Sequence, residues 1–178
     1  MTVETVAPYT LPVVRRLITS HTPEGKGTIH RDEKVESYLS PIKGCRITPL
    51  WTTTESPAIN SEQTLDGAGL APDRMHIVST NGSHIGAFDV APGLEVPTHR
   101  TSTLDYIILV NGELTSVMED GTESILTPGD IVIQRGTQHK WENRGTTWAR
   151  FIAVLVDAKP VELVNKEGEN VVLKEGWA

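Results

Sequence analysis

The chain has 178 residues and a mass of 19.5 kDa, which suits one domain with an additional arm, because domains usually hold about 100 to 150 residues. Its 38% of hydrophobic and 22% of charged residues are typical of a soluble globular protein and exclude a disordered chain. The formal net charge is -7, so most of the surface repels a phosphate backbone and nucleic acid is not an expected partner.

Cysteine content and the first residues bear on the compartment. Cys45 is the only cysteine, which excludes an intrachain disulfide and a cysteine-built zinc site. We expect it to be a small buried hydrophobic residue. The start, MTVETVAPYTLPVVRR, has an early Glu4 and a short apolar run before its arginines, the reverse of a secretory signal. No stretch approaches the roughly 18 to 20 apolar residues of a membrane span. We expect a cytoplasmic protein without a membrane partner.

Short apolar and β-branched runs, separated by turn residues, follow one another along the chain, and no window has a convincing helical period. The hairpin dipeptides Asn81-Gly82, Asn111-Gly112 and Asp120-Gly121 lie between such runs. A polar stretch covers residues 31–43, and an exposed loop is expected at residues 54–73. Closely spaced strands joined by tight turns predict an all-β antiparallel barrel or sandwich. The predicted strands are residues 11–18, 28–30, 46–53, 74–79, 83–90, 104–110, 113–119, 123–126, 130–134 and 147–157.

The segment from Pro92 to Asn143 carries two spaced motifs. The first places Gly93, His99 and Gly112 at the offsets of the cupin pattern G-x5-H-x-H-x(3,4)-E-x6-G. Thr101 stands where that pattern has its second His, and Asp105 stands where it has Glu.

The second motif is similar to the cupin pattern G-x5-P-x-G-x2-H-x3-N. Gly136, His139 and Asn143 keep their positions, while Gln134 replaces the proline. The chain thus resembles the small single-domain cupins, in a branch with the motifs HRTxTxDY and QRGTxHxWxN. The resemblance implies a jelly-roll β-barrel with an N-terminal strand arm and little helix. It divides the chain into an arm with strands and a loop (1–73), a barrel core (74–157) and a C-terminal tail (158–178).

Strand alternation predicts one shared pocket for both motifs, because side chains two residues apart point to the same face. If His99 points inward along one strand, Arg100 and Tyr106 point outward. On the second strand, an inward His139 brings Trp141 and Asn143 with it. The predicted inward set of the first strand is His99, Thr101, Thr103, Asp105, Ile107 and Leu109.

His99, Asp105 and His139 are the predicted catalytic residues. Two imidazoles and a carboxylate match the ligand set that holds a divalent ion with open positions, so the same trio is the predicted metal site for Fe, Zn, Mn or Ni. Without a metal, the trio serves as general acid and base. No nucleotide cofactor is expected. In the structural alternative, both histidines are core residues and the Thr101 and Thr103 hydroxyls satisfy Asp105.

The predicted substrate-binding residues are Thr101, Thr103, Ile107, Trp141 and Trp51. Trp141 is expected to line the pocket, with plugging of the barrel as its alternative. Arg100 and Arg135 are candidates to clamp a substrate carboxylate, with surface ion pairing as the alternative. Outside the pocket we expect surface positions for His30, His76 and His84, and packing or interface positions for Trp148 and Trp177.

The resemblance and the candidate residues lead to a functional hypothesis. We expect an enzyme for a small organic substrate, a lyase or isomerase that dehydrates, isomerises or decarboxylates in a biosynthetic pathway, secondary metabolism included, or in a catabolic one. One alternative is a non-haem Fe(II) oxygenase with a 2-His-1-Asp site. The other is a metabolite-binding cupin without catalysis. Cupins commonly pair and exchange N-terminal strands, which implies a homodimer.

Overall fold

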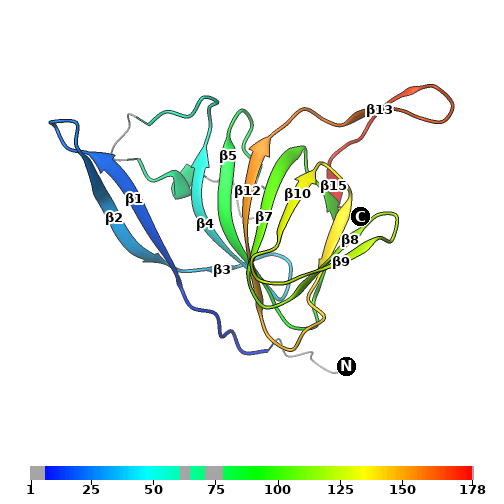
Figure 1. The fold of residues 1–178 in the computed structure, drawn as a ribbon, viewed down its shortest axis with the longest axis horizontal. Coiled ribbons are helices and arrows are strands. Elements are labelled where there is room, and N and C mark those ends of the chain that lie inside the picture. The colour runs from blue at the N-terminus through cyan, green and yellow to red at the C-terminus, as the bar shows by residue number, and fades with distance from the viewer. Residues whose placement is uncertain (1–6, 61–64, 71–77, 178) are drawn as a thin grey trace.

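Two antiparallel sheets enclose the centre of the molecule in a computed structural model that describes residues 7–60, 65–70 and 78–177 (Figure 1). The larger sheet has the order β10-β7-β12-β5-β4-β3, and the smaller has the order β15-β6-β11-β8-β9. This is the predicted all-β jelly roll. A 3-10 turn, η1 (Gly67–Leu70), is the sole helical element of the described residues, and among them no helix is long and apolar enough to cross a membrane.

The strands of the larger sheet are β3 (Tyr38–Leu39), β4 (Cys45–Thr53), β5 (Ser83–Val90), β7 (Thr103–Asn111), β10 (Ile131–Arg135) and β12 (Ala149–Asp157). The smaller sheet contains β6 (Glu95–Arg100), β8 (Leu114–Met118), β9 (Glu123–Leu126), β11 (His139–Glu142) and β15 (Gly176–Trp177). Two hairpins lie outside these sheets, β1 (Val14–His21) with β2 (Gly27–Val35), and β13 (Glu162–Val164) with β14 (Asn170–Val172).

Alternation along the strands builds the core between the two sheets. In β7, the side chains of Ile107 and Leu109 are buried, whereas Tyr106 and Val110 on the other face are exposed. This follows the period of two that a strand imposes on its side chains. The interior is completed by aromatic residues, with Phe88 and Phe151 stacked at a centroid distance of 5.3 Å. Burial of this apolar surface is the main force that holds the sheets together.

The N-terminal arm is fixed to the barrel by a buried ion pair. Arg150 donates from Nε to Asp89 Oδ1 at 2.5 Å and from Nη2 to Asp89 Oδ2 at 2.8 Å. The Tyr9 hydroxyl donates to the same carboxylate, and Arg150 Nη1 donates to the carbonyl of Pro12. The expected strand at residues 11–18 therefore begins later, at Val14, because the preceding residues serve as this anchor.

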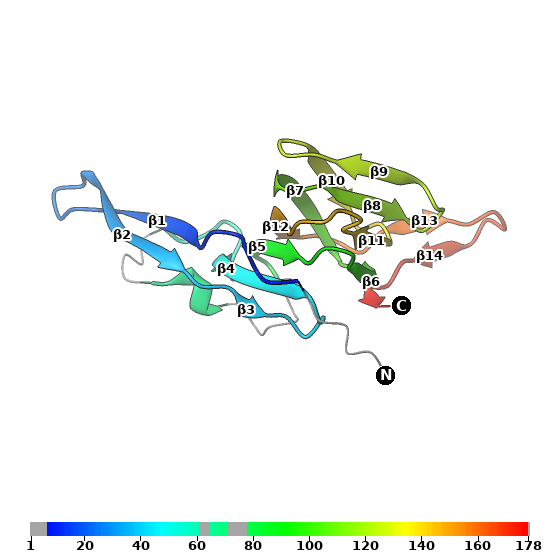
Figure 2. The same ribbon diagram turned by 90° about the horizontal axis from the view of Figure 1, so that it is seen from below.

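The β1–β2 hairpin projects beyond the two sheets (Figure 2). Its second strand extends well past the predicted residues 28–30, because polar residues of the stretch 31–43 pair with β1. Ion pairs link its strands and the loop that follows β4: Arg16 contacts Glu33 and also Asp66, the latter at 2.9 Å. In β1 half-buried and exposed side chains alternate, whereas the first four residues of β2 are all exposed and its later half-buried positions are mostly polar or charged, so the sequence of β2 lacks the apolar alternation that reveals a strand.

Several predicted boundaries differ from the structure. The predicted strand at residues 74–79 falls mostly outside the described residues, as does His76, and residues 78 and 79 are not in a strand. Strands β6 and β11, which carry the two motif histidines, and the hairpin β13–β14 were not among the predicted strands. β6 and β11 are short and interrupted in register, so their sequences show little periodicity.

Candidate functional site

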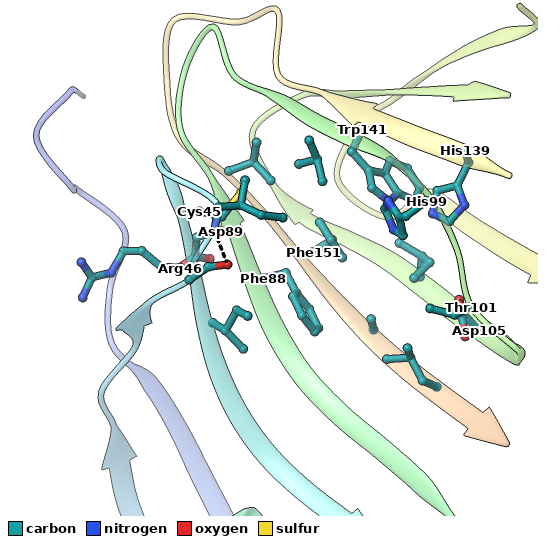
Figure 3. A pocket seen from close by; sticks show the side chains of 18 of the residues that line it. Cys45, Arg46, Phe88, Asp89, His99, Thr101, Asp105, His139, Trp141 and Phe151 are labelled. Atoms are coloured by element: carbon teal, nitrogen blue, oxygen red, sulfur yellow. Dashed lines mark hydrogen bonds between the residues drawn. The ribbon is translucent and has the colours of Figure 1, made fainter. Parts of the chain in front are cut away.

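A cavity of about 100 Å³ lies between the two sheets and is called the barrel cavity below (Figure 3). Its polar lining includes His99, Thr101, Asp105 and His139. Its apolar lining comes mostly from β4, β5 and β12 of the larger sheet, with single residues from β6, β7, β11 and β15. The apolar lining residues are Ile42, Cys45, Ile47, Phe88, Val90, Val96, Ile107, Trp141, Phe151, Ala153, Leu155 and Trp177.

His99 and His139 form an imidazole pair at one end of this cavity. They are cross-strand partners in β6 and β11, and their ring centroids are 4.3 Å apart. Nδ1 of His99 is 2.8 Å from the carbonyl of Pro97, and Nδ1 of His139 is 3.0 Å from the carbonyl of Thr137. Since a carbonyl only accepts, both Nδ1 atoms carry a proton. In each neutral ring the free lone pair is therefore on Nε2.

Burial keeps both rings of the imidazole pair neutral. Desolvation lowers the pKa of His139 to about 4, and the neighbouring charge of His99 acts in the same direction. Desolvation also lowers the pKa of His99, against the opposing effect of the Pro97 carbonyl. At neutral pH both Nε2 atoms are therefore available as proton acceptors.

Asp105 is buried in the same cavity with an exposed fraction of 4%. Burial raises the pKa of its carboxyl to about 6, although the hydroxyls of Thr103 and Thr101 act to lower it. Thr103 donates to the Thr101 hydroxyl at 2.8 Å. Oδ1 of Asp105 has no hydrogen-bond partner among the described residues. A carboxyl of this kind exchanges a proton near neutral pH and has an oxygen free to meet a ligand.

The chain crosses from the smaller to the larger sheet between His99 and Asp105. β6 ends at Arg100 and β7 begins at Thr103, so the predicted alternation along a single strand is wrong, although both residues still face the interior. In Figure 3, Asp105 and Thr101 lie together, apart from the imidazole pair. Within residues 7–60, 65–70 and 78–177, no three His, Cys, Asp or Glu side chains are placed to hold a metal ion. The predicted three-ligand set therefore does not fit this structure.

Of the predicted substrate-binding residues, Thr101, Ile107 and Trp141 line the barrel cavity. Thr103 does not line it, although its hydroxyl donates a hydrogen bond to Thr101, which does. Trp51 does not line the barrel cavity, contrary to the prediction. Its ring packs against Gly67 of η1 and borders a groove that is also lined by the β1–β2 hairpin. A register shift in β4 between Pro49 and Trp51 interrupts the alternation that the prediction assumed.

Trp177 is a cavity residue that sequence reasoning assigned to packing or an interface. Its indole stacks on His99 with a centroid distance of 4.5 Å and an interplanar angle of 22°, because β15 pairs with β6. No motif surrounds this residue, so the sequence carries no signal for its position. Cys45 and Phe88 also line the cavity, and burial raises the pKa of the Cys45 thiol to about 12, which excludes a thiolate nucleophile at neutral pH.

Comparisons with known proteins agree with the fold and the motifs. Residues 86–155 match the family described as Cupin domain. The chain is 33% identical over 168 residues to the cupin-domain-containing oxidoreductase fogC of Aspergillus ruber, with 88% of this chain and 78% of the relative covered. It is 33% identical over 171 residues to the cupin-domain-containing oxidoreductase virC of Hypocrea virens, with 88% and 84% covered.

Other similarities cover less of the chain. The phomopsin biosynthesis cluster protein D of Diaporthe leptostromiformis is 36% identical over 119 residues, which are 65% of this chain and 63% of the relative. The chain therefore spans less than two thirds of that relative. Among solved structures, the polyketide cyclase RemF from Streptomyces resistomycificus aligns with a TM-score of 0.47 and 21% identity over 68% of this chain and 72% of its own. From the similarity to fogC and virC over more than three quarters of each chain, this chain belongs to the cupin-domain proteins.

Proposed function

We propose that this cupin is an enzyme of secondary metabolism that transforms a small, mostly apolar or aromatic molecule by proton transfer. The observation that carries the proposal is the imidazole pair, two neutral rings with free Nε2 lone pairs in a mostly apolar cavity. The names of the relatives support a biosynthetic setting, since one is a phomopsin biosynthesis cluster protein. The reaction class is that of a lyase or isomerase.

The geometry suggests how the residues divide the work. One Nε2 of the imidazole pair removes a proton next to a substrate carbonyl, and the second ring stabilises the resulting enolate or returns a proton. Backbone carbonyls of Pro97 and Thr137 orient the two rings. Asp105 is therefore not needed to orient either ring, and its carboxyl, with a pKa raised to about 6, protonates a leaving hydroxyl.

Hydrogen exchange with solvent tests this proposal before the natural substrate is known. Aryl ketones are incubated in D₂O with the protein, without oxygen and with chelator, and deuterium at the carbon next to the carbonyl is measured by mass spectrometry. We expect exchange by the parent and a loss of at least about 100-fold in His139→Gln, because general acid–base catalysis contributes about 10²- to 10⁴-fold. His30→Asn, in the exposed β1–β2 hairpin, is the matched control. Equal exchange by all three proteins would contradict the proposal.

An oxidoreductase is the second candidate, because two relatives that align over 88% of this chain carry that name. Such a reaction requires a redox partner such as a bound metal ion or oxygen. Metal content by plasma mass spectrometry, for the parent and for His99→Ala, Asp105→Ala and His139→Ala, separates the candidates together with oxygen consumption. Stoichiometric metal that all three variants lose, with oxygen-dependent turnover, would favour the oxidoreductase.

A further inference from the structure

A second cavity, of about 220 Å³, shares the lining residue Thr101 with the barrel cavity. We call it the rim cavity; it is lined by residues 100–104 of the β6–β7 crossing, 135–136 at the end of β10, and Ala158, Lys159, Val161 and Leu173 of the C-terminal segment. Its charged lining residues are Arg100, Arg135 and Lys159, and no Asp or Glu is among the lining. In a chain with a net charge of -7, this is a local concentration of positive charge.

The positively charged side chains of the rim cavity have few acidic partners among the described residues. The Arg100 side chain is 13% exposed, and its Nε is buried without a hydrogen-bond partner among the described residues. Arg100 Nη2 lies 3.6 Å from the Glu119 carboxylate, which is 70% exposed. Because solvent screens such a pair, it neutralises little of the charge of Arg100. The side chains of Arg135 and Lys159 are exposed and form no ion pair or hydrogen bond with any residue that the structure describes; Arg135 pairs with Leu104 through the backbone of β10 and β7 only.

An unpartnered buried guanidinium N–H is unfavourable unless an acceptor meets it. Carboxylate and phosphate oxygens are the acceptors that match the planar fork of arginine. Thr101 and Ser102 line the same cavity, and the Ser102 hydroxyl can add a hydrogen bond. All of these groups favour a ligand with several oxygens and a negative charge.

We propose that the rim cavity is an oxyanion site. Its ligand is a carboxylate or a phosphate, which comes either from the substrate or from a free anion. The link to the substrate rests on the proposed function: a molecule whose apolar body occupies the barrel cavity presents its acidic group past Thr101 to Arg100 and Arg135. The site itself does not depend on the reaction.

Titration with inorganic phosphate, followed by the amide resonances of Thr101 and Gly136, tests the site directly. We expect saturable shifts in the parent and about tenfold weaker binding in Arg135→Gln, because the variant loses a charge-assisted hydrogen bond to the anion. Arg135 and Lys159 are exposed enough for Gln to be tolerated, and Lys159→Gln provides a second variant. Arg15→Gln, which removes the same charge from the exposed hairpin, should bind as the parent does. Absence of saturable shifts, or equal weakening in Arg15→Gln, would overturn the site.

A matched pair of ligands, 3-phenylpropanoate and 3-phenylpropanol, identifies the source of the anion. If it belongs to the substrate, the acid shifts both Gly136 and the Trp141 indole, binds about tenfold more tightly than the alcohol, and loses that preference in Arg135→Gln. Shifts at the rim alone would confirm the oxyanion site but overturn its link to the substrate. Failure of deuterium exchange would contradict the proposed function and leave both binding results intact.

Discussion

At the residue scale, His84 is the position where the structure most clearly reverses the prediction. It was expected at the surface, yet its exposed fraction is 2%. It pairs across strands with Leu155, whose side chain lines the barrel cavity, and cross-strand partners share a face. Its Nδ1 is 2.9 Å from the Thr52 hydroxyl, and its Nε2 has no partner among the described residues. Burial lowers the pKa of this ring to about 4.

This buried ring gives the free energy of unfolding a pH dependence. Between pH 6.5 and 4 the unfolded chain binds a proton on His84 that the folded chain does not, so the contribution to stability is complete above about 6.5 and lost as the pH falls toward 4. His139 acts in the same direction, whereas Asp105, with its raised pKa, acts in the opposite one.

We predict that His84→Asn weakens this pH dependence. Asn keeps a polar group near Thr52 but does not titrate. From pH 7.5 to pH 4.5, the free energy of unfolding of the parent should therefore fall by about 2 kcal/mol more than that of the variant. Urea unfolding at the two pH values measures this difference. The same fall in both proteins would show that His84 is not a buried neutral group.

At the scale of the elements, tight turns and one short strand position the site. Gly112 follows β7 with a φ of +75°, and a Cβ there would lie 2.8 Å from Ala149 Cα and from the Trp148 carbonyl. Gly121, in the next turn, has a φ of +85° but open space around it. β15 in turn brings Trp177 onto His99. The positive φ alone favours glycine at position 121. At position 112 both the positive φ and the close packing require it.

We predict that Gly112→Ala destabilises the protein by at least about 2 kcal/mol, whereas Gly121→Ala costs about 1 kcal/mol. Both variants suffer the strain of a left-handed backbone, but only the first also clashes with the backbone of residues 148 and 149. Denaturant midpoints of the two variants provide the comparison. Equal destabilisation would mean that the backbone near Gly112 yields to the extra methyl group.

A second prediction at this scale concerns Trp177. Removing its indole from the face of His99 admits water, so Trp177→Ala should move the lowered pKa of His99 upward, toward its ordinary value. An NMR titration of the His99 ring protons follows this change. Trp148→Phe alters a tryptophan that is buried outside the barrel cavity, with its indole N–H bonded to Pro8, and serves as the control. An unchanged pKa of His99 in Trp177→Ala would show that the Trp177 indole does not shield the His99 ring from water.

At the scale of the whole molecule, apolar side chains are exposed on one outer sheet face and on the N-terminal hairpin of the described part of the chain. Tyr106, Val110, Ile131 and Ile133 are between 40% and 62% exposed on β7 and β10 of the larger sheet. Neighbouring exposed apolar side chains of this kind often mark an interface between proteins. The projecting β1–β2 hairpin adds exposed Leu17 and Ile29. Homodimerisation stays a prediction, and we propose that it uses this sheet face.

We predict that Ile133→Glu converts a dimer into a monomer, because an unpaired carboxylate in an apolar interface is strongly unfavourable. Light scattering after gel filtration measures the mass. Ile125→Glu, at an exposed position of β9 in the smaller sheet, should leave the dimer intact. A dimer in both variants would exclude the sheet face, and a dimer that survives deletion of residues 1–20 would exclude exchange of the arm.

The sequence by itself determined the all-β class, because alternation and turn dipeptides such as Asn111-Gly112 are local properties of the chain. It also determined that His99 and His139 meet in one cavity, since their motif spacing is shared with other cupins. Only the tertiary structure decided the rest. The crossing between sheets after Arg100 separates Asp105 from the imidazole pair, and the distant β15 brings Trp177 onto His99. Such contacts join residues far apart along the chain, and local periodicity does not encode which strands become neighbours.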